Sequence, residues 1–272
     1  MKIAHISDVH IRFGSRHDEY RQVFKRLYKD LTEQKPDRIT ITGDVNQQKI
    51  NMSPGSMALL SEFLVNLVKV APVDIIMGNH DLNEQQLAQG DTITPFFDIS
   101  NKITGLQGTK KKMAHIVSKN NKDGLDLSEK GIYYYPESGF YDVGEEVVYG
   151  VYSVRDGEIL TLKKKDKNKK YIAMFHGQVY GARMDNGYEV MGDDKIQPTV
   201  FNNFDIVMLG DIHEHQAFRD DESMAYAGSL IQQDYGESID KGYLMWDLES
   251  NSFKRKYILS WKNNRYKRFF YL

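Results

Sequence analysis

Three short apolar strands alternate with two amphipathic helices in the first third of the chain, and this order restricts the fold more than any other feature. The strands are expected at residues 2–7, 38–42 and 73–77. Apolar residues recur at helical spacing over about residues 17–34, and a serine followed by a proline at 53–54 opens a second helix. A strand–helix–strand–helix–strand order predicts a parallel sheet with crossover helices, whose functional site lies beyond the carboxyl ends of the strands.

The second half of the chain is rich in predicted strands and contains no internal repeat. A sandwich of two β-sheets with helices outside accounts best for this pattern. The expected strands are residues 131–136, 146–153, 171–175, 204–209, 224–228 and 242–247.

Five short polar blocks follow one another along the chain, mostly where an apolar run ends. A single block carries little information, since a Gly–Asp pair is usually just a turn. Together they supply four histidines, four acidic residues and one asparagine, and their order indicates a phosphoesterase site built around two metal ions. The blocks are Asp8-Val9-His10, Gly43-Asp44, Gly78-Asn79-His80-Asp81, Phe175-His176-Gly177 and Gly210-Asp211-Ile212-His213.

Nitrogen and oxygen are the only strong metal-binding atoms available, because the chain has no cysteine. Two divalent ions about 3.5–4 Å apart neutralise the phosphoryl oxygens and lower the pKa of a bridging water. One carboxylate must reach both ions, and Asp44 at a strand end suits that role. Asp8 and His10 are expected on one ion and Asn79 on the other. His80 directly follows Asn79 and is therefore left free to act on the substrate.

The composition is that of an ordinary globular protein with a net charge of −2. This charge gives no sign of nucleic-acid binding, although residues 254–268 hold seven basic residues and no acid. No apolar stretch approaches the roughly 20 residues needed to cross a bilayer. Met1 leads almost directly into the first strand, which leaves no room for a signal peptide. We therefore expect a cytoplasmic protein without membrane attachment.

The polar blocks resemble those of the calcineurin-like metallophosphoesterase superfamily, over nearly the whole chain. This resemblance implies an α/β fold, a four-layer sandwich in which two central mixed β-sheets are flanked by helices. It also implies that His80 is the catalytic histidine, which stabilises the transition state or protonates the leaving oxygen. The implied ligands are Asp8, His10, Asp44 and His213 for one ion, and Asp44, Asn79, His176 and Asp211 for the other.

Two further segments resemble the nuclease subunits of SbcCD-type DNA repair complexes and their phage or viral relatives. The first is residues 16–21, and the second is residues 225–243, with its Gly-Ser-x-x-Gln, Gly-Glu and Lys-Gly pattern. The resemblance implies a manganese-dependent 3′-to-5′ exonuclease and single-strand endonuclease acting on DNA in recombination or repair. It further implies a coiled-coil ATPase partner of the SbcC type, a homodimer, and a location in the cytoplasm of a bacterium or of a phage- or virus-infected host.

The chain departs from the pattern of these relatives at three places. Asp211 stands where the superfamily usually has a histidine, and a carboxylate there is expected to favour Mn²⁺ or Mg²⁺; the alternative is a weakened second ion. Gln47 stands where many relatives carry an acid or a histidine. The chain also ends early, so we expect a nuclease domain over residues 1–250 and a basic extension over residues 251–272 that begins a capping or partner-binding region.

Several residues outside the blocks admit two interpretations. For His17 and Arg183, phosphate contact competes evenly with a solvated helix start and a surface loop, respectively. The lysine-rich residues 110–112 and 163–170 are interpreted as solvated surface in preference to DNA-contacting loops. His5 is expected in the core and His115 on the surface. The candidates for contacting substrate are Arg16, His17, Arg183 and His215.

Two other functions stay open beside a DNA nuclease. The same metals and ligands would serve a phosphatase or phosphodiesterase acting on small molecules or phosphoproteins, and the net acidity favours it mildly. A scaffold that kept the fold and lost the chemistry would explain Asp211. The residues over 225–243 favour the nuclease over the first alternative, and the otherwise complete ligand set argues against the second.

Overall fold

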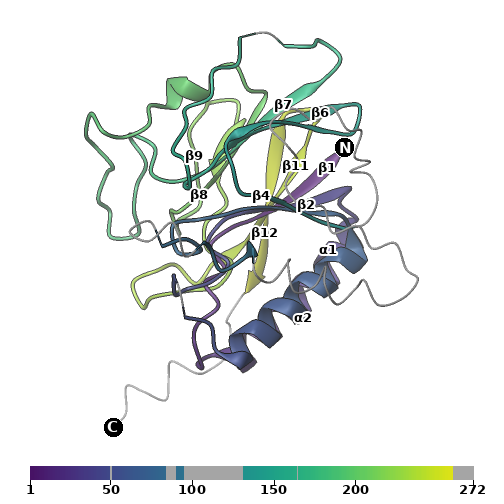
Figure 1. Ribbon diagram of the computed structural model, residues 1–272, viewed down its shortest axis with the longest axis vertical. Helices are drawn as coiled ribbons and strands as arrows, with labels where there is room; N and C mark the ends of the chain where they lie inside the picture. The colour runs from purple at the N-terminus through teal and green to yellow at the C-terminus, as the bar shows by residue number, and fades with distance from the viewer. Residues whose placement is uncertain (50, 84–89, 95–130, 164, 260–272) are drawn as a thin grey trace.

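The computed structural model describes residues 1–49, 51–83, 90–94, 131–163 and 165–259 and shows two six-stranded β-sheets packed face to face (Figure 1). Lys110 to Lys112, His115 and the chain beyond residue 259 lie outside the described residues. Within the described residues, no helix is long and apolar enough to cross a membrane. The expected α/β sandwich with two mixed sheets is confirmed.

The first sheet has the strand order β12-β11-β1-β2-β3-β4. Its four strands β1 to β4 run parallel, while β11 pairs antiparallel with β1 and β12 pairs antiparallel with β11. The strands are β1 (Lys2–Ile6), β2 (Arg38–Thr42), β3 (Val73–Ile76), β4 (Ile132–Tyr135), β11 (Lys241–Asp247) and β12 (Ser252–Leu259).

The second sheet has the order β5-β6-β7-β8-β10-β9. Its central strands β6, β7, β8 and β10 are parallel, and the two edge strands are antiparallel to their neighbours. The strands are β5 (Gly139–Val143), β6 (Val147–Tyr152), β7 (Lys170–His176), β8 (Ile206–Gly210), β9 (Gln216–Ala217) and β10 (Met224–Tyr226).

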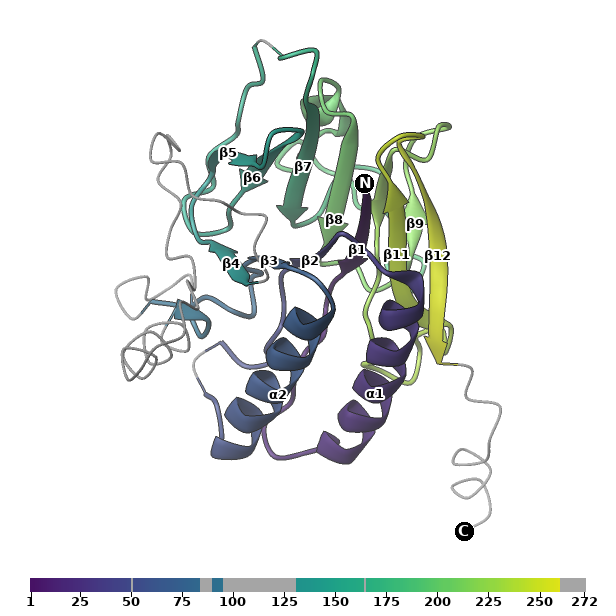
Figure 2. The same ribbon diagram turned by 90° about the vertical axis from the view of Figure 1, so that its right-hand side faces the viewer.

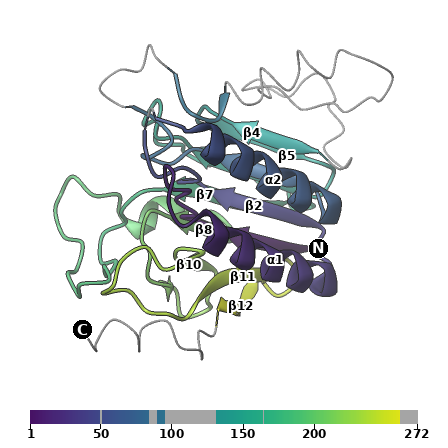
Figure 3. The ribbon, with the colours of Figure 1, turned by 90° about the horizontal axis from the view of Figure 1, so that it is seen from below.

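Helices α1 (His17–Gln34) and α2 (Pro54–Val70) cover the outer face of the first sheet, and the second sheet covers its inner face (Figure 2). The two helices lie side by side (Figure 3), and the rings of Phe24 and Phe63 stack between them at 4.3 Å. Ser53 caps α2 by accepting a hydrogen bond from the Ser56 N–H, and Pro54 follows it at the first helical position, as the sequence indicates.

Irregular chain covers the outer face of the second sheet. Among the described residues this layer contains no α-helix, only the short 3₁₀-helix Pro198–Phe201. Phe201 and Val179 from this layer pack on Val207 and Leu209 of β8 in one buried apolar cluster. The helices predicted to flank the sandwich therefore cover the first sheet, whereas apolar side chains from turns cover the outer face of the second sheet.

Strand β12 lies at the point where the sequence suggests a domain boundary at residue 250. It forms the edge of the first sheet, and Trp246 of β11 contacts Phe253 at a ring distance of 4.9 Å. Residues 252–259 therefore extend the sheet of the main domain. Strand β5 is a second element that the sequence pattern did not indicate.

Candidate metal centre

The five polar blocks meet at one end of the sandwich, where the parallel strands of both sheets finish. Strands β1 and β2 supply the first two blocks, β7 and β8 the last two, and the carboxyl ends lie away from the N-terminus (Figure 3). Four of the predicted ligands have a left-handed backbone, a conformation that non-glycine residues seldom adopt and that is often retained at functional sites. These are Asp8 (φ 50°), His10 (φ 50°), Asp44 (φ 53°) and Asp211 (φ 94°).

Glycines in the blocks let the strand ends approach closely. A Cβ atom at Gly78 would collide with the Asp44 carboxylate, and one at Gly210 with the Thr42 carbonyl oxygen. A side chain at Gly78 would displace the Asp44 carboxylate, and one at Gly210 would force β8 of the second sheet away from β2 of the first. The glycines that precede Asn79 and Asp211 are thus required by packing.

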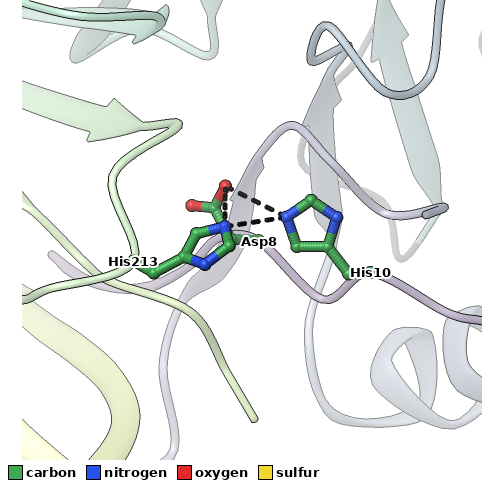
Figure 4. Close-up of side chains that lie close together, drawn as sticks. All are labelled: Asp8, His10 and His213. Carbon is green, nitrogen blue, oxygen red and sulfur yellow. Dashed lines mark hydrogen bonds and ion pairs between the residues drawn. The ribbon is translucent and has the colours of Figure 1, made fainter. Parts of the chain in front are cut away.

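Asp8, His10 and His213 form one group of converging ligand atoms (Figure 4). The Nε2 atoms of His10 and His213 lie 3.0 Å apart. The Asp8 Oδ1 atom lies 3.8 Å from the first of these nitrogens and 3.9 Å from the second. Asp8 and His10 are buried, so burial raises the pKa of Asp8 to about 6 and lowers the pKa of His10 to about 3. A neutral imidazole is the form that binds a metal ion.

Asp44 lies between this group and a second one. Its Oδ2 atom is 3.5 Å from His10 Nε2, while its Oδ1 atom is 3.3 Å from His176 Nε2. His176 Nε2 also lies 3.3 Å from Asn79 Oδ1 and 3.8 Å from Asp211 Oδ1. The two oxygens of Asp44 thus face the two groups separately, as a carboxylate shared by two ions must.

The second ring nitrogen of two of these histidines is held by an acceptor. His176 Nδ1 donates to the Thr42 carbonyl at 2.7 Å, since a carbonyl only accepts, and His213 Nδ1 donates to Glu237 at 2.7 Å. With Nδ1 as the donor, the neutral form of each ring would direct the lone pair of Nε2 toward the cluster, and a cation bound there would favour that form. Burial opposes protonation of His213, but the Glu237 hydrogen bond and the Asp8 charge outweigh it and raise the pKa of His213 to about 9.

Glu237 is a functional residue that reasoning from the sequence missed. Besides His213, its buried carboxylate accepts hydrogen bonds from Ser229 Oγ at 3.3 Å and Gln233 N–H at 2.9 Å. The buried ammonium of Lys241 lies 3.0 Å from Glu237 Oε2 and donates to the His213 carbonyl at 2.9 Å. Ser229, Glu237 and Lys241 belong to the Gly-Ser-x-x-Gln, Gly-Glu and Lys-Gly pattern of the segment 225–243, so that pattern was the available signal.

Asp81 belongs to the third polar block, but the sequence assigned it no role. Its buried carboxylate accepts hydrogen bonds from the N–H groups of Gly78 and Asn46, each at 3.0 Å, and of Val45 at 3.3 Å. It therefore joins the loop after β2 to the loop after β3 behind Asp44. Burial and the neighbouring Asp44 charge raise the pKa of Asp81 to about 7. The position of Asp81 beside His80 in this block was the signal in the sequence that could have indicated its role.

His80 also reaches the cluster, because one of its ring nitrogens lies within 4.8 Å of ligand atoms of His10 and Asp44. Its ring lies perpendicular to that of His10 at 4.9 Å, and its backbone N–H donates to Asp44 at 2.8 Å. His80 Nδ1 donates to the Gln47 carbonyl at 2.7 Å. The acceptor is the backbone carbonyl of Gln47, so any residue at position 47 could orient His80 in this way.

The donor set fits divalent cations. Three imidazoles, three carboxylates and one amide oxygen converge, and within the described residues the buried carboxylates of Asp8 and Asp44 form ion pairs with histidines alone. Burying such charges is costly unless a cation compensates them. The described residues therefore provide a candidate site for two metal ions held by nitrogen and oxygen.

Among the described residues, the groups of converging ligand atoms contain none of the four candidate substrate residues. Arg16 pairs with Glu19 at 2.7 Å, and His17 Nε2 donates to the Arg12 carbonyl at 2.8 Å. His215 Nδ1 donates to the Tyr226 carbonyl at 2.8 Å. Arg183 is exposed, and its backbone is clamped by the side chain of Gln216.

His5 is buried in β1, as expected for a core residue. It accepts a hydrogen bond from Trp246 Nε1 at 3.3 Å and contacts Thr42 Oγ1 at 2.8 Å. In the lysine-rich segment, Lys165 pairs with Asp205 just before β8 at 2.8 Å, and Lys169 pairs with Asp142 of β5 at 2.5 Å. Both observations agree with a structural role.

Comparison with known proteins agrees with this geometry. The sequence pattern of calcineurin-like phosphoesterases matches residues 1–215. An uncharacterised protein of Acanthamoeba polyphaga mimivirus is 35% identical over 92% of this chain, which spans only 17% of that protein. The SbcD component of the nuclease SbcCD from Staphylococcus saprophyticus is 23% identical over 95% of the chain and 68% of its own length. Because this pattern matches most of the chain, and the cluster of candidate ligands agrees with it, the chain belongs to the calcineurin-like phosphoesterase family.

Proposed function

We propose that this chain hydrolyses the phosphodiester bonds of DNA, as the nuclease subunit of a recombination or repair complex. One observation carries the proposal. The segment over residues 225–243, which resembles the corresponding run of SbcD-like nucleases, supplies Glu237 and Lys241 to the surroundings of His213. The similarity to the staphylococcal nuclease subunit supports the same conclusion.

In this proposal, the two groups of converging atoms hold two divalent ions, Mn²⁺ or Mg²⁺. Bound there, the ions would neutralise the phosphoryl oxygens and activate a water molecule. Asp211 contributes a hard oxygen donor, which suits these two metals. The proposed ligands are Asp8, His10, Asp44 and His213 for one ion, and Asp44, Asn79, His176 and Asp211 for the other.

His80 is the proposed catalytic residue. Because its Nδ1–H is bound to the Gln47 carbonyl, the ring can exchange a proton only at Nε2. A protonated Nε2 would donate to a phosphoryl or leaving-group oxygen and stabilise the charge that develops there. The N–H bond to Asp44 fixes the distance between this proton donor and the ligand cluster.

The proposed partners are DNA, a coiled-coil ATPase of the SbcC type and a second copy of the chain. The name of the staphylococcal relative, which belongs to SbcCD, supports the ATPase. On α2, Met57 and Val65 are exposed apolar residues available to a second copy. Light scattering of the chain alone would test the homodimer.

Cleavage of end-labelled DNA tests the activity. Single- and double-stranded DNA would be incubated with Mn²⁺, Mg²⁺ or a chelator, beside His80→Ala and the surface control Glu62→Gln. We expect manganese-dependent products from the wild type and the control but not from His80→Ala, and their ladder gives the polarity. Intact DNA together with hydrolysis of p-nitrophenyl phosphate would refute the nuclease and support a phosphatase.

A further inference from the structure

The ring of His10 is held differently from the rings of the other two proposed ligand histidines. His176 and His213 each donate an Nδ1–H to an acceptor behind the ring. Within the described residues, the Nδ1 atom of His10 is buried and has no hydrogen-bond partner. A ligand histidine almost always gives this second nitrogen to an acceptor, which fixes the direction in which the first nitrogen points. The direction of the His10 ring must therefore be set by its backbone and by packing.

The backbone of His10 has a conformation that needs support. Its φ of 50° lies in the left-handed region, where the Cβ atom of an L-residue is crowded by the following carbonyl oxygen. On one side, the His10 N–H donates to the Asp44 carbonyl at 2.9 Å, which joins the loop after β1 to the loop after β2. The Ile11 N–H continues this pairing by donating to the Val45 carbonyl at 2.9 Å. On the other side, the His10 carbonyl faces helix α1.

A phenol in the first turn of α1 holds this second side. Tyr20 is fully buried, and its hydroxyl donates to the His10 carbonyl, because a carbonyl oxygen only accepts. The apolar spacing of the helix requires only an apolar side chain at this position, so the hydroxyl is an addition to what packing needs. A buried tyrosine hydroxyl usually finds a partner. Here the partner is the backbone of a proposed metal ligand.

Tyr20 is itself fixed by the start of α1. The guanidinium of Arg16 lies 5.9 Å from the centre of the Tyr20 ring and donates to the Gln232 carbonyl at 2.8 Å. The Tyr20 ring contacts the ring of Phe24 at 5.8 Å, and Phe24 stacks on Phe63 of α2 at 4.3 Å. The position of the hydroxyl is therefore set by the packing of the helix, and the loop of His10 adapts to it.

We propose that Tyr20 is a positioning residue, whose hydroxyl holds the loop of His10 so that the Nε2 atom of His10 faces the ion proposed between Asp8, His10 and His213 (Figure 4). This role rests on the proposed two-metal function of the site and deepens it, because Tyr20 acts through a ligand without touching an ion. The other proposed ion should not depend on Tyr20, since its histidine, His176, has an acceptor of its own.

Removal of the hydroxyl alone tests this role. Tyr20→Phe keeps the buried ring. Tyr28→Phe is the matched control, because Tyr28 lies about two turns further along α1 and its hydroxyl donates to the Phe63 carbonyl at 3.5 Å instead of to a ligand. Calorimetry would measure Mn²⁺ binding to the wild type and both variants. The visible absorption of bound Co²⁺ would report the arrangement of the ligands.

Tyr20→Phe should weaken the binding of one of two Mn²⁺ ions roughly 2- to 12-fold, the factor that one hydrogen bond contributes to an equilibrium. Without the hydroxyl, the metal-free loop can leave its left-handed conformation, and binding of the ion must restore it. The second ion should bind as before, and the Co²⁺ absorption bands should shift. Tyr28→Phe should change neither the affinities nor the bands.

The same substitution in His10→Ala protein separates positioning from a general loss of stability. The ring to be positioned is then gone, so Tyr20→Phe should cause no further loss of Mn²⁺ affinity. Unchanged affinities in Tyr20→Phe, equal weakening of both ions, or a further loss in the His10→Ala background would overturn the role. If the wild type binds two ions but cuts no DNA, only the nuclease function is refuted; if it binds no Mn²⁺, both proposals are overturned.

Discussion

Replacing Glu237 by glutamine would remove one charge from a buried network and leave its shape. Burial opposes ionisation of Glu237, but the hydrogen bonds from His213 and Gln233 and the charge of Lys241 outweigh it and lower the pKa of Glu237 from 4.5 to about 2. A shift of one unit corresponds to about 1.4 kcal/mol. The ionised carboxylate therefore contributes about 3 kcal/mol to the free energy of unfolding, and about 2 kcal/mol after allowance for solvent screening.

The sign of the pH dependence follows from the lowered pKa. The contribution is fully present above pH 4.5, where the unfolded chain is also ionised, and is lost as the pH falls through about 2. Glu237→Gln should thus destabilise the metal-free protein by about 2–3 kcal/mol at pH 7. The difference from wild type should shrink steadily below pH 4.5, because protonated Glu237 and glutamine are both neutral.

Urea unfolding in chelator, followed by tryptophan fluorescence, measures this difference. Trp246 is fully buried and reports on the first sheet. Glu62→Gln, which breaks an exposed pair with Arg21, is the matched control and should change stability by less than about 1 kcal/mol. Calorimetry should also show a 10- to 100-fold weaker Mn²⁺ affinity, roughly the cost of losing a partner that orients a ligand histidine. A difference below about 0.5 kcal/mol at pH 7, or one that is unchanged at pH 3, would refute the reasoning.

Three further substitutions test the centre itself. His80→Ala should lower cleavage at least about 100-fold with Mn²⁺ binding intact by calorimetry, because the ring acts on substrate; lost binding would make His80 a ligand. Asp44→Ala should lose both ions, since its two oxygens face separate groups, and two ions retained in the titration would contradict the shared role. Asp211→His should keep activity within about tenfold and change the preference among Mn²⁺, Mg²⁺ and Zn²⁺. An unchanged preference would show that Asp211 binds no ion.

The fold could be predicted where local pattern and tertiary contact agree. Helix α1 begins at His17 and ends at Gln34, as its apolar spacing indicates, and the polar blocks lie where parallel strands end. Strand β12 was missed because its run of basic residues looks like a solvated tail. On the edge of a sheet, such charges face water and discourage pairing with other chains.

The candidate ligands were easier to recognise in the sequence than the residues that hold them in place. Ligand chemistry admits few residue types, so Asp, His and Asn at strand ends are conspicuous. Glu237 accepts a hydrogen bond from His213, which lies 24 residues earlier in the chain. Glu237 is on a loop, where no periodic pattern shows which way a side chain points. The left-handed backbone of Asp8 and Asp44 could not be predicted from the sequence either. Aspartate has only a weak local preference for this conformation, so contacts with the surrounding loops must impose it.

The candidate metal centre draws its atoms from both sheets of the sandwich, and this has a consequence for how the chain would acquire activity. Asp8 and His10 follow β1 in one sheet, and His213 follows β8 in the other, 203 residues after His10. Ions held by residues of both sheets would bind only after the two sheets have docked, and their binding would then stabilise the docked state. A chain still emerging from the ribosome would therefore be inactive until both sheets have formed. A chain cut before β8 would lack His213 and stay inactive.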